Sequence, residues 1–340
     1  MASKQVPLQM IPPAAAPEFL SRHGWDGAEI LPLAGDASFR RYFRVRAPGR
    51  SAVLMDAPPD KEDIGPFLAI AAELDARGLS APQALAIDRE SGLLLLEDFG
   101  DRLVGPVLRH DPSPERAIYA DAIRILDLLS KQAAPSGLAP YDEAVMLREV
   151  RLFTEWYAPA VGLAVDEKGF DAAWQAVWRD VLDVVADDPV LVLRDYHADN
   201  LLLLDRPGLK RLGLLDFQDA LAGHPAYDLV SLLQDARRDV SPELEEEMLA
   251  EYLAAGAWAE PERFRAHYEI LGAQRNTKIL GIFTRLWRRD GKPGYLAYQP
   301  RVWGYLERNL RHPALAPVAR WFDANVPRSA RAAHWERAGA

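Results

Sequence analysis

The chain has 340 residues, of which 49% are hydrophobic and 26% are charged, so it is long enough for one large domain or two smaller ones. A formal net charge of -10 and a pI of about 5.3 do not suit a dedicated nucleic-acid binder, which usually carries a basic face. The absence of cysteine excludes disulfides, cysteine-ligated zinc and a cysteine nucleophile.

The N-terminal segment predicts neither a signal peptide nor a membrane anchor. Residues 1–19 contain no apolar run of about 7–15 residues, and no stretch approaches the roughly 18 apolar residues of a membrane-spanning helix. Its proline and alanine content is typical of loosely ordered chain, so we expect a flexible arm over residues 1–20. A cytoplasmic protein without nucleic-acid or membrane partners is the expectation, with a monomer as its simplest oligomeric state.

Residues 21–100 predict a small β-rich lobe with one helix. Short apolar runs separated by turn residues predict its strands, at residues 29–34, 39–45 and 51–56 and on either side of a turn near residue 91. Residues 64–78 show helical spacing and end at Gly78, a residue type that often follows a helix.

Residues 101–340 predict a larger, mostly helical lobe. Several long segments carry the helical spacing of apolar residues, and one β-hairpin between residues 190 and 219 interrupts them. The hinge between the lobes is expected near residues 98–101. The predicted fold class is therefore α+β, with an antiparallel β-rich N-lobe followed by a helical C-lobe.

The hairpin carries polar residues at the ends of apolar strands, where they are costly unless they are used. Pairing about Gly208 would place Leu202 opposite Leu214 and Asn200 opposite Asp216, with the last two side chains about 5 Å apart. A carboxylate and an amide oxygen at that separation can share one Mg²⁺, whose coordination shell is normally completed by substrate phosphates.

Asp195 precedes Asn200 by five residues and has no expected strand partner. A carboxylate beside a metal–phosphate site can accept the proton of a hydroxyl acceptor and orient its oxygen for attack. Each acidic or amide side chain alone would more simply cap a turn. Together, Asp195, Asn200 and Asp216 favour phosphoryl transfer.

The motifs "RDYHADN" at 194–200 and "LLDFQD" at 214–219 resemble the catalytic and metal loops of protein-kinase-like enzymes, in the aminoglycoside phosphotransferase/choline kinase family. Further similarity lies in "GDASFRRYFRV", "LLLEDFGD", "YDLVSLLQD" and "KILGIFTRL". Together these segments are most similar to the sugar kinases that phosphorylate N-acetylmuramate and N-acetylglucosamine at the anomeric hydroxyl. The resemblance covers roughly residues 20–315.

The resemblance implies a bilobal protein-kinase-like fold that uses ATP and Mg²⁺. It implies that Asp195 is the catalytic base and that Asn200 and Asp216 are metal ligands. It also implies that the small-molecule amino-sugar substrate becomes a sugar 1-phosphate, in the recycling of peptidoglycan.

The β-rich lobe is expected to bind the nucleotide. Gly35 and Ser38, at the tip of a predicted hairpin, would offer backbone and hydroxyl donors to the phosphates. Glu97 and Phe99, on the strand that leads to the hinge, would bind adenine through the backbone. Glu73, on the predicted helix, would pair with the cation that grips the phosphates, with an exposed helix face as the alternative.

The sequence departs from the kinase pattern at Met55, where the phosphate-gripping lysine usually stands. Pairing about the Pro-Gly turn would place Phe43 opposite Met55 and Arg41 on the same face of the sheet. We therefore predict that Arg41 supplies the missing charge, with Arg40 or Arg44 as alternatives, since an arginine fork suits phosphate oxygens. Surface charges without a ligand are the simpler interpretation.

Five residues are candidate sugar contacts. His197, Asp199 and Asp219 lie in or beside the motif loops, with loop-bracing and turn-capping as alternatives. Trp156 would offer an aromatic face to a pyranose, and Arg275 a cation to the lactyl carboxylate of N-acetylmuramate. Both lie on predicted helices, where aromatic residues usually belong to the core.

Two other functions remain open from the sequence. A kinase of the same fold that phosphorylates an aminoglycoside or choline would need a carboxylate-rich pocket for a cation. A non-catalytic nucleotide-binding module would explain Met55, but not the retention of the Asp195, Asn200 and Asp216 set.

Overall fold

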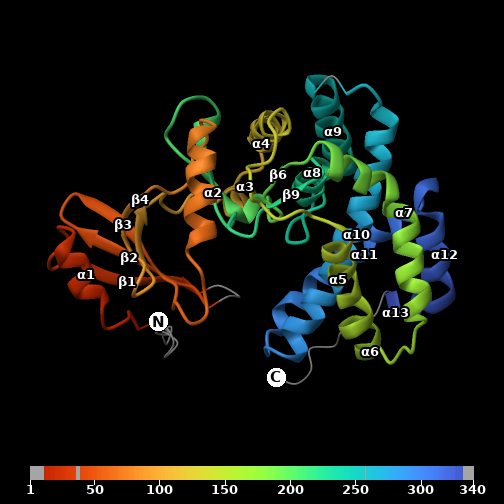
Figure 1. Ribbon diagram of the computed structural model, residues 1–340, viewed down its shortest axis with the longest axis horizontal. Coiled ribbons are helices and arrows are strands. Elements are labelled where there is room, and N and C mark those ends of the chain that lie inside the picture. Colours follow the sequence, from red (N-terminus) through yellow and green to blue (C-terminus); the bar gives the residue numbers. More distant parts are fainter. Residues whose placement is uncertain (1–10, 36–38, 257, 332–340) are drawn as a thin grey trace. The chain divides into compact units, whose positions relative to one another are not determined.

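The computed structural model describes residues 11–35, 39–256 and 258–331, which are coloured along the chain in Figure 1. The described chain divides into two compact units. One unit contains the residues up to 103 together with 201–219, and the other contains 104–200 together with the residues from 220 onward.

The first unit is built on a five-stranded antiparallel sheet with the order β1-β2-β3-β5-β4. Its elements are α1 (Ala16–Arg22), β1 (Glu29–Gly35), β2 (Arg41–Ala47), β3 (Arg50–Asp56), α2 (Gly65–Ala76), β4 (Ala84–Asp88), β5 (Leu93–Glu97), β7 (Leu201–Leu203), the short 3-10 helix η3 (Gly208–Arg211) and β8 (Leu212–Leu214). The five strands and the helix that were predicted between residues 29 and 100 are confirmed.

The pairing of β2 with β3 differs from the predicted register by one residue. A two-residue turn, in which Gly49 has φ +76°, joins the strands, so Phe43 lies opposite Leu54 and not opposite Met55. Because the turn has two residues, every pair between the two strands is shifted by one position from the prediction. Side chains alternate between the faces of a sheet, so this slip decides which face each arginine of β2 occupies.

Helix α1 covers one face of the sheet, as Figure 1 shows in red and orange. Phe19 and Leu20 are buried against Phe43, Leu54 and Leu95. Burial of each such side chain contributes about 1.5–3 kcal/mol. The expectation of a flexible arm over residues 1–20 is therefore wrong from Ala16 onward, and residues 1–10 lie outside the described chain.

The β7–β8 hairpin belongs to this first unit, although the sequence placed it in the helical lobe. Ser80 forms a β-bridge with Gly213, and the Leu203 N–H donates to the Arg102 carbonyl oxygen at 2.9 Å. Backbone hydrogen bonds to segments that are distant in the chain thus attach the hairpin to the first unit. The strands pair Leu201 with Leu214, so the predicted pairing of Leu202 with Leu214 is also wrong by one residue.

The second unit is mostly helical, which confirms the predicted fold class. Its helices are α3 (Val104–His110), α4 (Glu115–Ser130), α5 (Glu143–Leu152), α6 (Ala158–Ala160), α7 (Glu167–Asp187), α8 (Ala226–Leu233), α9 (Pro242–Gly256), α10 (Pro261–Arg288), α11 (Gln299–Asn309), α12 (Ala316–Asn325) and α13 (Arg328–Arg331). Shorter elements are the π-helix η1 (Phe153–Tyr157), the paired strands β6 (Val190–Val192) and β9 (Leu221–Gly223), and the 3-10 helices η2 (Ala198–Asn200), η4 (Pro293–Tyr298) and η5 (Pro313–Leu315).

Helix α10 is the centre of this unit and contacts α5, α7, α8, α11 and η1 (Figure 1). Its middle is buried on all sides, which is unusual for a helix that carries Arg275 and Lys278 there. These cations therefore need buried partners. In the part of the chain that the structure describes, no helix is both long and apolar enough to cross a membrane.

Gly281 lets α10 approach the end of α5 closely, because a Cβ atom at this position would lie 2.3 Å from the Leu152 carbonyl carbon and oxygen. We expect Gly281→Ala to destabilise the protein by about 1–3 kcal/mol through overpacking. Gly304 on α11 has no neighbour within 4 Å of its would-be Cβ, so Gly304→Ala should instead stabilise by about 0.5–1 kcal/mol. Urea unfolding of both variants tests this contrast, which equal effects of the two changes would contradict.

Candidate active site

The loop that follows β6 is anchored through its backbone. The carboxylate of Asp228, at the start of α8, accepts hydrogen bonds from the N–H groups of Leu193 at 2.7 Å and of Arg194 at 2.8 Å. Arg194 has φ +70°, a left-handed conformation that is strained for a residue with a side chain. Burial raises the pKa of Asp228 to about 7, although the two N–H donors act in the opposite direction.

A second buried carboxylate fixes the Arg194 side chain. Glu149 on α5 pairs with Arg194 and, at 2.8 Å, with the Lys278 ammonium of α10. Tyr141 and Gln274 donate to its other oxygen. Burial alone would raise the pKa of Glu149, but the charges of Lys278 and Arg194 outweigh it and lower the pKa to about 2.

Asp195, the predicted catalytic base, directly follows this anchored position. Its side chain is 44% exposed, and its Oδ1 lies 3.5 Å from the Arg275 guanidinium, which is itself buried. Desolvation would raise the pKa of Asp195, but Arg275 and Lys278 overcome this effect and hold the pKa well below its usual range. The carboxylate is therefore ionised at neutral pH and oriented by a buried cation.

Asn200 closes the loop onto Asp195. Its side-chain Nδ2 donates to the Asp195 carbonyl oxygen at 2.9 Å, and its backbone N–H donates to the His197 carbonyl oxygen at 2.8 Å. Because the Nδ2 end faces a carbonyl, the amide oxygen is the end directed elsewhere. Asn200 immediately precedes β7 in the chain, and Asp216 follows β8 by two residues.

His197 braces the loop, which was one of its two predicted roles. It is buried, and its Nε2 lies 2.9 Å from the Arg237 guanidinium. Burial and the nearby charge of Arg237 lower the pKa of His197 to about 3, so the ring is neutral. Since Nε2 accepts from Arg237, Nδ1 carries the proton, and no partner for Nδ1 lies within the described residues. A sugar contact for His197 stays a prediction.

Asp199 is held at the start of α3 and lies 3.7 Å from Arg109. A Cβ atom at Gly105 would lie 1.9 Å from the Asp199 carboxylate, so this contact needs a glycine. Its side chain is partly exposed, and a sugar contact remains a prediction.

In the first unit, Asp216 also has a left-handed backbone, with φ +58°. Its Oδ1 accepts from the Gln218 amide at 2.8 Å and lies 3.8 Å from the Arg40 guanidinium. The next residue, Phe217, is buried and stacks on Phe67 of α2, with the ring centroids 5.1 Å apart. These contacts fix where Asp216 sits relative to α2 and β2.

Asp219, a predicted sugar contact, is exposed and lies 3.3 Å from the Gln218 amide. Trp156, the predicted sugar platform, lies on the π-helix η1 and is half-buried. Single π-helical turns are frequent at functional sites. Both assignments remain predictions.

Two predicted nucleotide contacts have other partners. Glu73 pairs with Arg77 on its own helix, with an N–O distance of 2.7 Å, which agrees with the alternative of a helix-surface role. Glu97 pairs with Arg206, and its backbone N–H donates to the Gln83 carbonyl oxygen at 2.8 Å, so that donor is already used.

The other nucleotide contacts, Phe99, Gly35 and Ser38, stay predictions. The Phe99 ring lies beneath Arg206, at 5.1 Å from the guanidinium carbon to the ring centroid. Gly35 ends β1, and Ser38 lies outside the described residues.

The sequence did not predict the roles of Asp228, Glu149 and Lys278. Asp228 was visible only as part of "YDLVSLLQD", and no spacing rule connected it with a loop 35 residues earlier. Glu149 and Lys278 are charged residues on amphipathic helices, where an exposed position is the usual expectation. Only the packing of α5 against α10 shows that both are buried.

The oxygen atoms of Asp216 and Asn200 fit the hard donors that Mg²⁺ prefers. The orientation of the Asn200 amide is consistent with this use. In the described chain, no group of three or more His, Cys, Asp or Glu residues is gathered as a metal cluster.

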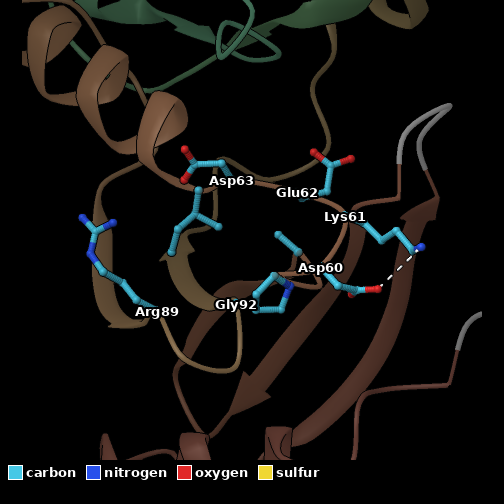
Figure 2. Close-up of a pocket in the computed structure, with 9 residues that line it drawn as sticks. Asp60, Lys61, Glu62, Asp63, Arg89 and Gly92 are labelled. Atoms are coloured by element: carbon cyan, nitrogen blue, oxygen red, sulfur yellow. Dashed lines mark ion pairs between the residues drawn. The ribbon is translucent and has the colours of Figure 1, made fainter.

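A separate pocket of about 440 Å³ lies beside the segment between β3 and α2 (Figure 2). Figure 2 shows Asp60, Lys61, Glu62 and Asp63 along that segment, with Arg89 on the turn that closes the other side. Glu62 connects this pocket with the Asp216 region, because its carboxylate also lies 4.0 Å from Arg40.

The fold is that of kinase-like phosphotransferases. The structure of the GDP complex of an aminoglycoside 2'-phosphotransferase-IIIa superposes with a TM-score of 0.58 at 15% sequence identity, covering 86% of this chain and 97% of that one. The likeness shows a shared fold.

The profile of the phosphotransferase enzyme family matches residues 29–267, and the chain belongs to this family. It is 39% identical to an N-acetylmuramate/N-acetylglucosamine kinase of Caulobacter vibrioides, over 92% of this chain and 96% of that protein. It is 38% identical to a protein of the same description from Pseudomonas aeruginosa, over 93% of this chain and 95% of that protein. The family that the sequence motifs indicated is thereby confirmed.

The neutral, buried His197 predicts a pH dependence of stability. Its pKa is about 3 in the folded protein and about 6.5 in the unfolded chain, which therefore binds a proton that the folded protein does not. Stability should fall by about 2 kcal/mol from this residue between pH 8 and pH 5. Urea unfolding of the wild type and of His197→Gln at both pH values measures it. The same pH slope in both proteins would refute it.

Proposed function

We propose that this protein is an ATP-dependent kinase that phosphorylates the anomeric hydroxyl of N-acetylmuramate and N-acetylglucosamine. The relatives at 38–39% identity over more than nine-tenths of the chain support the acceptor. The observation that carries the chemistry is Asp195, a partly exposed and ionised carboxylate on a rigidly anchored loop. Its product, a sugar 1-phosphate, would serve the recycling of peptidoglycan sugars in the cytoplasm.

In this reaction the anomeric oxygen forms a bond to the γ-phosphorus of ATP while the bond to the β–γ bridging oxygen breaks, releasing ADP. The proton of the anomeric hydroxyl passes to the Asp195 carboxylate. A base of such low pKa is weak, so Asp195 would act chiefly by orienting the hydroxyl, and would take its proton late in the transfer. Arg275 and the loop anchor hold its position.

Asp216 and Asn200 would hold Mg²⁺. When bound, the metal neutralises phosphate charge and fixes the phosphate geometry. The left-handed backbone at Asp216 and the stacking of Phe217 on Phe67 keep the carboxylate in place for this role.

An anionic or neutral acceptor suits this site better than a cation. Asp195 is flanked by Arg275 and Lys278, whose charges oppose a second cation at the same carboxylate. Aminoglycosides and choline are cations and need acidic pockets. N-acetylmuramate and N-acetylglucosamine, the sugars in the names of the relatives, are not cations, so they agree with the charges around Asp195.

A binding module without turnover is the function that differs in class. It needs no ionised and oriented carboxylate at Asp195, whereas three residues from different helices support that loop: Glu149, Asp228 and Arg275. Buried charged residues that position one exposed carboxylate favour catalysis over binding alone.

The purified protein with Mg²⁺·ATP should phosphorylate N-acetylmuramate and N-acetylglucosamine, but not kanamycin or choline. Phosphorus NMR of the products should show a sugar 1-phosphate. Asp195→Asn should lower kcat by about 10²–10⁴-fold, since it removes a positioned proton acceptor, while ADP binding stays close to wild type.

Turnover of a cationic acceptor would keep the enzyme class and refute the sugar assignment. Binding of ADP without transfer to any of the four acceptors, or equal rates for the wild type and Asp195→Asn, would refute the proposed reaction.

Arg275→Met separates two roles for this arginine. Its ion pair with Asp195 predicts that kcat falls by a similar factor, about 10-fold, for both sugars. A direct contact with the lactyl carboxylate would instead lower kcat/KM for N-acetylmuramate alone. Steady-state kinetics with both sugars decide between them, with Arg288→Met, an exposed arginine of the same helix, as the control.

A further inference from the structure

We infer that Arg40 is the residue that grips the nucleotide phosphates, with Glu62 as its positioning partner. This inference deepens the proposed function and rests on it. Arg40 thus takes the role for which the sequence favours Arg41. Arg40, Glu62 and Asp216 all lie within the first unit of the structure. Three observations carry it: the faces of β2, the partners of its arginines and the surroundings of Asp216.

Arg41 lies on the wrong face of the sheet for this role. It is opposite Asp56 and lies on the face of Phe43 and Leu54, which α1 covers. Met55, at the usual lysine position, pairs with Tyr42 and points to the other face. The guanidinium of Arg41 makes two hydrogen bonds with Asp56, a carboxylate that is only 3% exposed. Arg41 therefore neutralises a buried acid.

Arg44 lies on the face of Met55, but its guanidinium pairs with carboxylates that follow β5. Its guanidinium lies 2.9 Å from an Asp98 oxygen and 2.8 Å from an Asp101 oxygen. It also donates to the Gly100 carbonyl oxygen at 3.2 Å. Three contacts to one short segment make Arg44 a brace for residues 98–101.

Arg40 stands immediately before β2 and faces the metal-binding candidate. Its Nη2 lies 3.8 Å from Asp216 Oδ1, and its side chain is only 8% exposed. A phosphate bound to a metal at Asp216 must lie within a few ångströms of that carboxylate, because Mg²⁺–oxygen distances are about 2.0–2.1 Å. A guanidinium at this place can therefore reach the same phosphate oxygens.

Glu62 also pairs with Arg40, as a helix glutamate does with the usual lysine. Its Oε2 lies 4.0 Å from Arg40 Nε, and its Oε1 accepts the Phe39 N–H at 3.1 Å. This accounts for Glu73, which pairs with Arg77 and not with a cation of the sheet. Both the cation and its acidic partner thus differ from the usual positions: Arg40 lies immediately before β2, and Glu62 lies in the segment before α2.

A guanidinium suits this displaced position. It presents five N–H donors in a planar fork, so it can contact a carboxylate and a phosphate at the same time. Its charge is permanent, so burial at 8% exposure does not discharge it as it can discharge a lysine.

The test compares nucleotide binding by the wild type, Arg40→Met and Arg40→Lys, measured by calorimetry with ADP and with adenosine. Loss of a charge-assisted contact to phosphate should weaken ADP binding by about 10- to 100-fold in Arg40→Met, and less in Arg40→Lys. Adenosine has no phosphate, so its affinity should not change. If the wild type prefers guanine, GDP and guanosine replace this pair.

Two controls separate a direct phosphate contact from indirect effects of the substitution. Arg46→Met, at an exposed position on the same strand, should bind ADP like the wild type. Repeating the titration with EDTA in place of Mg²⁺ shows whether Arg40 acts directly on phosphate, in which case the loss persists, or only through a metal at Asp216, in which case it disappears.

Unchanged ADP affinity in Arg40→Met, an equal loss of adenosine affinity, or a loss confined to Mg²⁺ would overturn the inference. None of these binding measurements contains a sugar. Failure of the wild type to phosphorylate either sugar would thus refute the proposed function without deciding the role of Arg40.

Discussion

The anchoring of Leu193 and Arg194 to the Asp228 carboxylate is the constraint on which the rest of the site depends. It stabilises a left-handed backbone at Arg194, which would otherwise cost on the order of 1–3 kcal/mol. That turn directs the Arg194 side chain inward to Glu149 and leaves Asp195 partly exposed. The amide of Asn200 then closes on the Asp195 carbonyl oxygen. Loss of the anchor would release all of these positions together.

Buried charge serves position more than stability in this protein. Glu149 is surrounded by Lys278 and Arg194, and each of these groups would be costly without the others. The same helix, α10, carries Arg275 to Asp195, so one buried face sets both the support of the loop and the charge state of the predicted base. In the first unit, the buried Arg40 guanidinium likewise lies near a carboxylate, the partly exposed Asp216. A pre-positioned charge needs little reorganisation when a phosphoryl group is transferred.

The sequence predicted much of the fold because its patterns are local. The strands at β1, β2 and β3 and the helix α2 follow from apolar runs and turn residues. Both hairpin registers were wrong by one residue, because apolar spacing does not reveal how many residues a turn uses. That small error placed Arg41 on the face of Met55. The sequence left two roles open for His197, because its partner Arg237 is distant in the chain. It left two roles open for Glu73, because the sequence does not show which cation pairs with this glutamate.

The sequence by itself determined the family and the α+β class. It also selected Asp195, Asn200 and Asp216 as the candidate site, because their spacing within two short motifs is a local property of the chain. The tertiary structure decided which distant charges meet. Asp228, Glu149 and Lys278 gather around one loop only because α5, α8 and α10 pack together. Likewise, the strand pairing places Arg41 opposite Asp56, and only the tertiary contact of Arg40 with Asp216 shows where that second arginine lies. Contacts between distant residues depend on packing and register, and no single stretch of sequence encodes either.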